Sequence, residues 1–144
     1  MADTDTIIAH ARNWIGTPYR HRASKKGVGC DCLGLVRGVW RELLGHEPAP
    51  LPPYAPEWAE VSTRDTLLEA AQRFLVRAQM NVPDAGCVVL FRWREGAPCK
   101  HVGIMSGQER FIHAYDRVGT VESPLVPMWR TKIAAHFQFP LIFQ

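Results

Sequence analysis

The sequence has no marked excess of one charge and no long apolar run. Its 144 residues carry 17 Lys and Arg against 14 Asp and Glu, and no run of basic residues exceeds two. A basic stripe for nucleic acid is therefore not indicated. No stretch reaches the length of a transmembrane helix, and the acidic residues 1–5 precede no apolar segment of the secretory-signal type. We expect a chain made in the cytoplasm, with neither nucleic acid nor membrane insertion.

Cysteine is scarce, with four residues in the chain. Cys30 and Cys32 are too close for an ordinary disulfide, and cytoplasmic thiols stay reduced, so a disulfide framework is disfavoured. A zinc-binding module remains an alternative because four soft ligands are available. These ligands are Cys30, Cys32, Cys99 and His101. They form two pairs, Cys30 with Cys32 and Cys99 with His101, and a single residue separates the two members of each pair. Structural zinc motifs usually have two residues between their cysteines. We expect no metal and no other cofactor.

Apolar residues recur at helical spacing in the first half of the chain. The pattern predicts a helix ending at Gly16, a second over about 35–44 with a stop at Gly45, and a third over about 67–78. Thr63 is the expected N-cap of the third helix. A Pro-rich connection at about 46–62 separates the second helix from the third, because prolines forbid regular structure there.

Short alternating segments dominate the second half and predict strands. They lie at 87–93, 101–106, 110–114, 118–122 and about 133–139. Helices followed by strands favour an α+β fold, with N-terminal helices packed on a C-terminal antiparallel sheet. The length and the 47% hydrophobic content fit a single domain over residues 1–144.

Cys32 opens the second helix, where unpaired N–H groups and the helix dipole favour a thiolate. We therefore expect a lowered pKa and a nucleophilic sulfur, against the alternative of an inert buried cysteine. Tyr19, which follows a Gly-Thr-Pro turn, could donate its hydroxyl to an oxyanion or simply pack half-buried.

Two histidines follow on adjacent strands of a predicted hairpin. If the connecting loop has three residues, Ser106 pairs with Arg110 and Gly103 lies opposite His113. His101 and His113 then share one face, which suits a general base held by a second ring. A two-residue loop would place them on opposite faces, so two unrelated histidines are the alternative.

Five sequence blocks together resemble the NlpC-type cell-wall cysteine peptidases, which are papain-like. The blocks are Gly16-Thr17-Pro18-Tyr19, Asp31-Cys32-Leu33-Gly34-Leu35-Val36, Pro83-Asp84-Ala85-Gly86-Cys87-Val88-Val89-Leu90-Phe91, His101-Val102-Gly103-Ile104-Met105 and Phe111-Ile112-His113-Ala114. They occur in that family's order and spacing, and the resemblance covers most of the chain, from about residue 7 to 122.

The resemblance implies a role for each matched residue. Cys32 is the nucleophile, His101 the general base and acid, and His113 the residue that orients His101. Tyr19 and the Cys32 backbone N–H would meet the oxyanion, and Asp31 would help to hold the free amino end of a stem peptide. The implied reaction is hydrolysis of a peptidoglycan stem-peptide amide, typically between γ-D-glutamate and a diamino acid, through a thioester.

Two positions depart from the family pattern. Leu33 replaces the usual Ser, and Pro83-Asp84-Ala85-Gly86 replaces a Pro-Gly-Asp turn. The Asp-Cys-Leu-Gly variant resembles the subgroup encoded beside phage tail genes. The resemblance implies a component of a phage-like tail tip or baseplate, partnered by other tail proteins, that opens the target cell wall for DNA entry. A catalytically idle tail component, or an amidase or acyltransferase on the same fold, is the competing interpretation.

Overall fold

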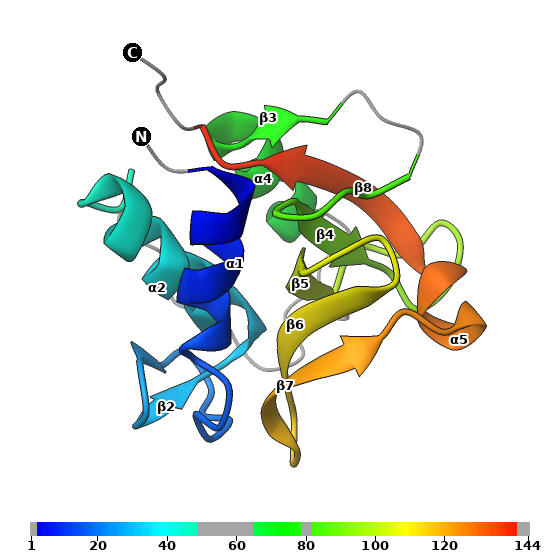
Figure 1. Ribbon diagram of the computed structural model, residues 1–144. Coiled ribbons are helices and arrows are strands. Elements are labelled where there is room, and N and C mark those ends of the chain that lie inside the picture. The colour runs from blue at the N-terminus through cyan, green and yellow to red at the C-terminus, as the bar shows by residue number, and fades with distance from the viewer. Residues whose placement is uncertain (1–2, 49–64, 79–81, 141–144) are drawn as a thin grey trace.

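The computed structural model describes residues 3–48, 65–78 and 82–140, and these form the expected α+β fold (Figure 1). Three helices cover the early chain: α1 (Thr4–Arg12), α2 (Cys32–Leu44) and α4 (Thr66–Phe74). A short helix, α5 (Pro127–Arg130), follows late in the chain and was not predicted. It begins at Pro127, whose fixed φ suits a first helical position.

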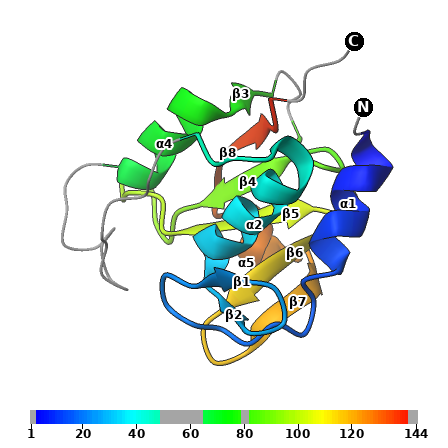
Figure 2. The ribbon, with the colours of Figure 1, turned by 90° about the vertical axis from the view of Figure 1, so that its left-hand side faces the viewer.

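Six antiparallel strands form the main sheet in the order β3-β8-β4-β5-β6-β7. Their bounds are β3 (Val76–Arg77), β4 (Val88–Phe91), β5 (His101–Met105), β6 (Arg110–Tyr115), β7 (Gly119–Pro124) and β8 (Ile133–Gln138). A separate pair, β1 (Ser24–Lys25) and β2 (Gly29–Cys30), lies in the loop before α2. Figure 2 shows α1, α2 and α4 in front of the main sheet.

Alternation along the central strands divides the buried side chains between the two sheet faces. Leu90 and Val102 belong to the core between the sheet and the helices. Phe91 and Met105, their strand neighbours on the opposite face, join a second core with Trp129 of α5. Both faces of β4 and β5 are therefore buried, which fixes their register firmly.

A glycine lets the first two helices approach closely. A Cβ at Gly38 would lie 2.0 Å from the Trp14 ring, so only glycine leaves room for the indole. The ring is 2% exposed, and its Nε1 donates to Glu42 over 3.2 Å. The contact sets the direction of α2 and so the position of its first residue.

The third predicted helix is shorter than expected. Thr63 lies outside the described residues, and the cap is Asp65, whose carboxylate accepts from the Leu68 N–H over 3.2 Å. The helix ends at Phe74 because Val76 and Arg77 pair with the end of β8 as an edge strand. Tertiary pairing here overrides helix propensity. Most of the Pro-rich connection, residues 49–64, is also outside the described part.

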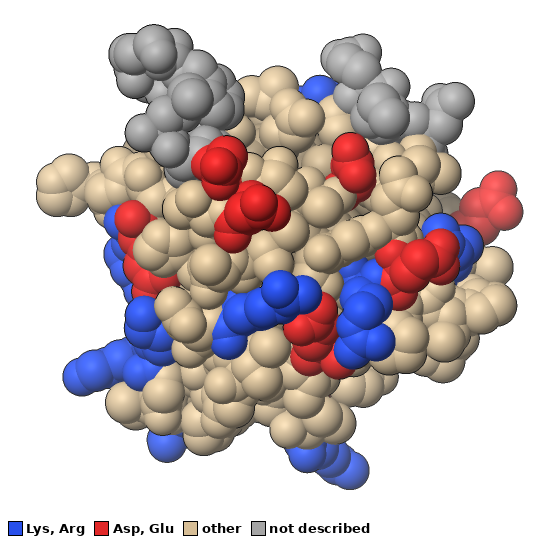
Figure 3. All heavy atoms as spheres, in the orientation of Figure 1, with Lys and Arg blue, Asp and Glu red and all other residues tan. Residues whose placement is uncertain are grey.

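Charges of both signs are interspersed on the face that Figure 3 shows. Several are paired, as in the contact of 3.0 Å between Arg12 and Glu122. Within the described residues no helix is both long and apolar enough to cross a membrane.

Candidate active site

The carboxylate of Asp31 shapes the start of α2. Its Oδ1 accepts from the Gly34 N–H over 2.7 Å, and its Oδ2 accepts from the Arg22 N–H at the same distance. The first bond caps the helix. The second ties the preceding loop to the cap. Asp31 is 2% exposed, so its position favours this capping role; contact with a substrate amine remains a prediction.

Cys32 begins α2, which packs against β5 and β6. Their registered pairs are Ile104 with Ile112 and Met105 with Phe111. The Val102 N–H lies close enough to the Cys32 sulfur to lower the pKa of its thiol. The thiol therefore lies near the residue that follows His101, beyond the last registered pair of the two histidine-bearing strands. The His101 ring hydrogen-bonds to His113 here, and contacts between a base and a nucleophile often form only when substrate binds.

The expectation of a lowered Cys32 pKa is wrong for this geometry. Burial and the neighbouring Asp31 carboxylate raise the pKa of the Cys32 thiol to about 12, and they outweigh the N–H groups of Val102, Leu33 and Cys32 itself, which lower it. Desolvation penalises a thiolate more than the helix start favours it. At rest Cys32 is therefore a neutral thiol, and a nucleophilic role would require a base to remove its proton.

The three-residue loop between β5 and β6 is confirmed. The Ser106 N–H donates to the Arg110 carbonyl over 3.0 Å. A Cβ at Gly103 would lie 3.2 Å from the His113 Cβ, which places the glycine opposite that histidine. The two rings share one face, with His101 Nε2 and His113 Nδ1 2.8 Å apart.

A third strand extends this pair into a chain that sequence reasoning missed. His113 Nε2 lies 2.9 Å from Ser123 Oγ on β7. For His101 to accept a proton at Nδ1, its Nε2–H must donate to His113 Nδ1, and His113 Nε2–H then donates to Ser123. This arrangement satisfies both bonds and leaves His101 Nδ1 free to accept a proton, whereas the reversed arrangement, in which the Ser123 hydroxyl donates, would place the proton on His101 Nδ1. The diagonal position of Ser123 on β7 was the available signal, because Val121 is the direct partner of His113.

Burial keeps both rings neutral. His101 is 5% exposed and His113 is 1% exposed. Burial, aided by the His113 charge, lowers the pKa of His101 well below 6.5, and burial lowers the pKa of His113 to about 4. A neutral His101 is the form that can accept a proton from the Cys32 thiol.

Aromatic rings surround the histidines on the face away from α2. Trp93 stacks on His101 with centroids 6.1 Å apart and planes inclined by 18°. Trp129 lies 5.4 Å from His101 and 5.3 Å from His113. This packing restricts the orientation of both rings and accounts for their desolvation.

Tyr19 is held near Cys32. Tyr19 and Cys30 form an isolated parallel β-bridge. The Arg20 N–H donates to the Cys30 carbonyl and the Cys30 N–H donates to the Pro18 carbonyl, both over 3.0 Å, and these bonds hold the segment in place. Burial, with Cys32 as the next contributor, raises the pKa of the Tyr19 hydroxyl. The hydroxyl is therefore protonated and able to donate, close enough to Cys32 for their charges to interact.

The residues of the zinc alternative make other contacts. The Cys30 sulfur lies 3.2 Å from the Thr120 hydroxyl, and the Cys99 sulfur accepts from Arg92 over 3.8 Å. Among the described residues, no group of three or more His, Cys, Asp or Glu side chains could hold a metal ion. All four cysteines are free thiols.

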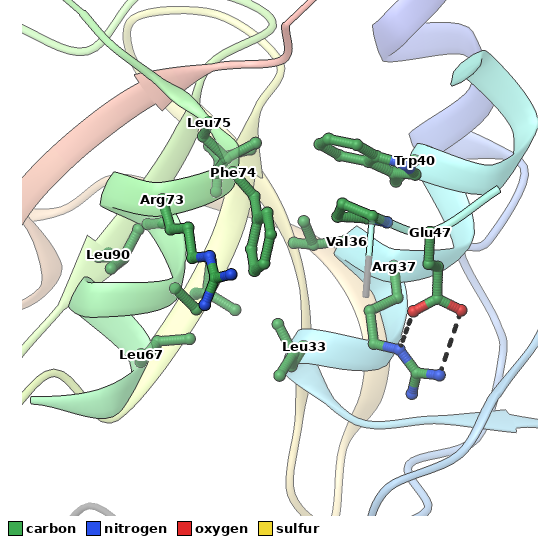
Figure 4. A pocket seen from close by; sticks show the side chains of 15 residues that line it. Leu33, Val36, Arg37, Trp40, Glu47, Leu67, Arg73, Phe74, Leu75 and Leu90 are labelled. Atoms are coloured by element: carbon green, nitrogen blue, oxygen red, sulfur yellow. Dashed lines mark hydrogen bonds and ion pairs between the residues drawn. The ribbon is translucent and has the colours of Figure 1, made fainter. Parts of the chain in front are cut away.

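An apolar cavity of about 260 Å³ adjoins the site on the helix side of the sheet. Leu33 and Val102, the residues after Cys32 and His101, are among its lining residues. Figure 4 shows Leu33 and Trp40 of α2 facing Phe74 of α4 across the space, with the Arg37–Glu47 ion pair at the rim. The leucine that replaces the family's serine thus packs toward an apolar space.

Known proteins resemble this chain over most of its length. The murein DD-endopeptidase MepS/murein LD-carboxypeptidase of Escherichia coli strain K12 is 31% identical over 127 residues, which are 88% of this chain and 57% of that protein. The probable endopeptidase NlpC of the same strain is 29% identical over 133 residues, covering 87% of this chain and 73% of that protein. The chain therefore spans little more than half of the first of these relatives.

Solved structures share the fold. The NlpC/p60 domain of the peptidoglycan hydrolase SagA has a TM-score of 0.65 at 20% identity, over 96% of this chain and all of that one. An NlpC/P60 family protein from Bacillus cereus ATCC 10987 has a TM-score of 0.69 at 18% identity, over 96% and 40%. The model of the NlpC/P60 family matches residues 16–137, a span that contains Cys32, both histidines and Ser123. The chain belongs to the NlpC/P60 family.

Proposed function

We propose that this chain is a cysteine peptidase that hydrolyses amide bonds in peptidoglycan stem peptides. The observation that carries the proposal is the hydrogen-bonded pair of histidines on β5 and β6, with the Cys32 thiol of α2 near the Val102 N–H, next to His101. Such an arrangement supplies a nucleophile, a base and an orienting group. Two relatives named as endopeptidases support the reaction type, and the murein endopeptidase among them supports the substrate class.

Acylation begins with both partners neutral. The Cys32 sulfur attacks the scissile carbonyl carbon while its proton passes to His101 Nδ1, so that the C–S bond forms as the imidazolium forms. His113 accepts from His101 Nε2 and stabilises that cation. The Cys32 backbone N–H and the Tyr19 hydroxyl are the donors proposed for the oxyanion.

Collapse of the tetrahedral intermediate breaks the C–N bond, and His101 gives its proton to the leaving amine. Water then attacks the thioester and gives a proton to His101. The C–S bond breaks, a carboxylate product leaves, and the thiol regains its proton. One imidazole thus serves as base and acid in each half of the reaction.

The test is digestion of diaminopimelate-type peptidoglycan by the wild type, Cys32→Ala and Cys87→Ala, with fragment masses as the readout. Cys87→Ala makes the same change at a buried cysteine outside the site. We expect wild type and Cys87→Ala to release stem-peptide fragments and Cys32→Ala to release none. Equal digestion by Cys32→Ala would remove Cys32 from the mechanism.

The masses also decide which bond is cut. The bond between γ-D-glutamate and the diamino acid is our first candidate, from the sequence resemblance. Cleavage of the D,D cross-link is the second, because the relative from Escherichia coli carries the name DD-endopeptidase. The first gives fragments that end at glutamate, and the second gives uncross-linked peptides of unchanged length.

We also propose that the protein acts from a phage-like tail tip or baseplate, in the wall of a target cell. The support is the Asp31-Cys32-Leu33-Gly34 variant and its resemblance to tail-associated members. Detection in purified particles by mass spectrometry is the expected result. If the protein were found free in cells and missing from purified particles, the proposed tail location would be contradicted. Particles that carry the protein but digest no wall would favour the catalytically idle alternative.

A further inference from the structure

A second pocket is lined in part by Trp93, whose ring stacks on His101. It has a volume of about 320 Å³ and is formed by residues around the end of β4 and the start of β8. Three cationic side chains line it, those of Arg92, Arg94 and Lys132, against one carboxylate, that of the exposed Glu95. We refer to it as the Arg92 pocket. Its lining favours an anionic occupant.

Arg92 anchors the pocket but leaves one donor unused. Its Nη2 lies 3.8 Å from the Cys99 sulfur and 3.7 Å from Asp65 Oδ2. Its Nε is buried and, among the described residues, has no hydrogen-bond partner. Buried polar groups in native proteins are rarely left unpaired. A carboxylate is bound most strongly by arginine through two parallel N–H bonds, and the Nε–H offers one of them.

Backbone geometry holds the pocket together. The Arg92 N–H donates to the Lys132 carbonyl over 2.9 Å, next to the register shift between β4 and β8 at Leu90 and Phe91. That irregularity carries Arg92 out of the regular ladder, as bulges beside functional sites often do. Within the described residues, neither Arg94 nor Lys132 has a recorded ion pair, so both charges are available to a ligand.

Trp93 connects this pocket to the catalytic base. Its ring lines the pocket and also lies 6.1 Å from the His101 ring. A residue of extended chain spans about 3.3 Å. A substrate group bound in the pocket would thus be separated from the scissile amide, which lies beside His101, by only a few bonds or by one or two residues of the substrate. Both candidate substrates carry a carboxylate at that range: the α-carboxylate that a γ-linked glutamate leaves free, and the carboxylate of the diamino acid.

From this juxtaposition we infer that the Arg92 pocket is a subsite for a free carboxylate of the stem peptide. The inference rests on the proposed function. Arg92 Nε–H donates to the carboxylate, and Arg94 and Lys132 neutralise its charge. Trp93 then forms the wall between this anchor and the reacting amide. Binding here would position the scissile bond and favour acidic stem peptides over amidated ones.

The test compares one stem peptide in three forms: unmodified, with the glutamate α-carboxylate amidated, and with the diamino-acid carboxylate amidated. Cleavage by the wild type is measured as kcat/KM, and affinity is measured by calorimetry on Cys32→Ala. The subsite variant is Arg94→Gln with Lys132→Gln, and Arg92→Lys removes the Nε–H while keeping the charge. Lys25→Gln with Arg77→Gln is the control, because it removes two exposed charges outside the pocket.

We expect one of the amidations to reduce kcat/KM and affinity by about tenfold in the wild type and the control. The form that is sensitive identifies which carboxylate binds. The subsite variant should bind all three forms equally, and Arg92→Lys should lose most of the preference while melting near the wild-type temperature. Equal kcat/KM and equal affinity of the wild type for all three peptide forms would contradict the proposed subsite. Carboxylate-dependent binding without cleavage would refute the proposed function and leave the subsite supported.

Discussion

Ser123 Oγ lies 2.9 Å from His113 Nε2 and ends a hydrogen-bond chain that crosses three strands. The chain begins at His101 on β5, passes through His113 on β6 and reaches Ser123 on β7. Both nitrogens of His113 have a partner, and His101 has one at Nε2, so a hydroxyl that accepts from His113 Nε2 favours the state in which His101 Nδ1 is free to accept a proton. We therefore expect Ser123 to act as a positioning residue.

Replacement of this hydroxyl tests the chain. Ser123→Ala removes one neutral hydrogen bond, worth about 0.5–1.5 kcal/mol, so we expect kcat to fall about threefold to tenfold with little change in KM. The pH profile should also change, because His113 then loses its fixed tautomer. Ser123→Thr, which keeps the hydroxyl, should recover much of the activity. Equal pH profiles for wild type and Ser123→Ala would contradict a positioning role.

Alkylation by iodoacetamide reports the protonation state of Cys32. Thiolate is the reactive form, and the raised pKa of about 12 predicts slow labelling at pH 6 that accelerates roughly tenfold per pH unit through pH 9. His101→Ala should label at a similar rate, because burial and the Asp31 carboxylate, and not the His101 ring, raise the pKa of the Cys32 thiol. Mass spectrometry would locate the label, with Cys32→Ala giving the background from the other three cysteines. Fast labelling independent of pH would indicate a preformed ion pair instead.

The parts of the site that sequence predicted are those fixed by local rules. The helix start at Cys32 follows from Asp31 and the apolar periodicity after it. The shared face of His101 and His113 follows from strand alternation and from a loop length counted between two neighbouring strands. Neither inference needed knowledge of distant packing.

The parts that were missed depend on contacts between distant segments. Ser123 reaches the site only because β7 pairs with β6, and the direction of the Cys32 pKa shift reverses because the sulfur becomes buried against Val102. The early end of α4 has the same origin, since Val76 and Arg77 are recruited by β8. Burial and long-range pairing are properties of the folded chain, and a linear pattern does not record them.

The free energy of unfolding should decrease as the pH is lowered from 6.5 towards 4, mostly above the pH range in which carboxylates become protonated. Burial lowers the pKa of His113 from 6.5 to about 4, so between these values the unfolded state binds the extra proton and stability falls as pH falls. One such group contributes about 1.4 kcal/mol per pH unit, and the buried His101 shifts in the same direction. Urea unfolding at pH 7, 6 and 5 would measure the slope. His113→Gln should have a shallower slope, and an unchanged slope would contradict the assignment.

Gly103 provides the space in which the two histidine rings meet. An alanine Cβ there would lie 3.0 Å from the Ile112 carbonyl oxygen and from the Phe111 ring, and 3.2 Å from the His113 Cβ. Because buried neighbours surround it, the hairpin must shift, and we expect Gly103→Ala to cost about 1–3 kcal/mol of stability.

The same shift would stretch the 2.8 Å bond between His101 and His113, so activity should fall by about tenfold or more even at temperatures where the variant is folded. Gly107→Ala in the loop of the same hairpin is the matched control, since a Cβ there meets nothing within 4 Å. Its stability should stay within about 0.5 kcal/mol of the wild type. Thermal melts and digestion rates measured on both variants would separate loss of fold from loss of geometry. A Gly103→Ala protein as stable and active as Gly107→Ala would show that the close approach of the strands does not set the ring pair.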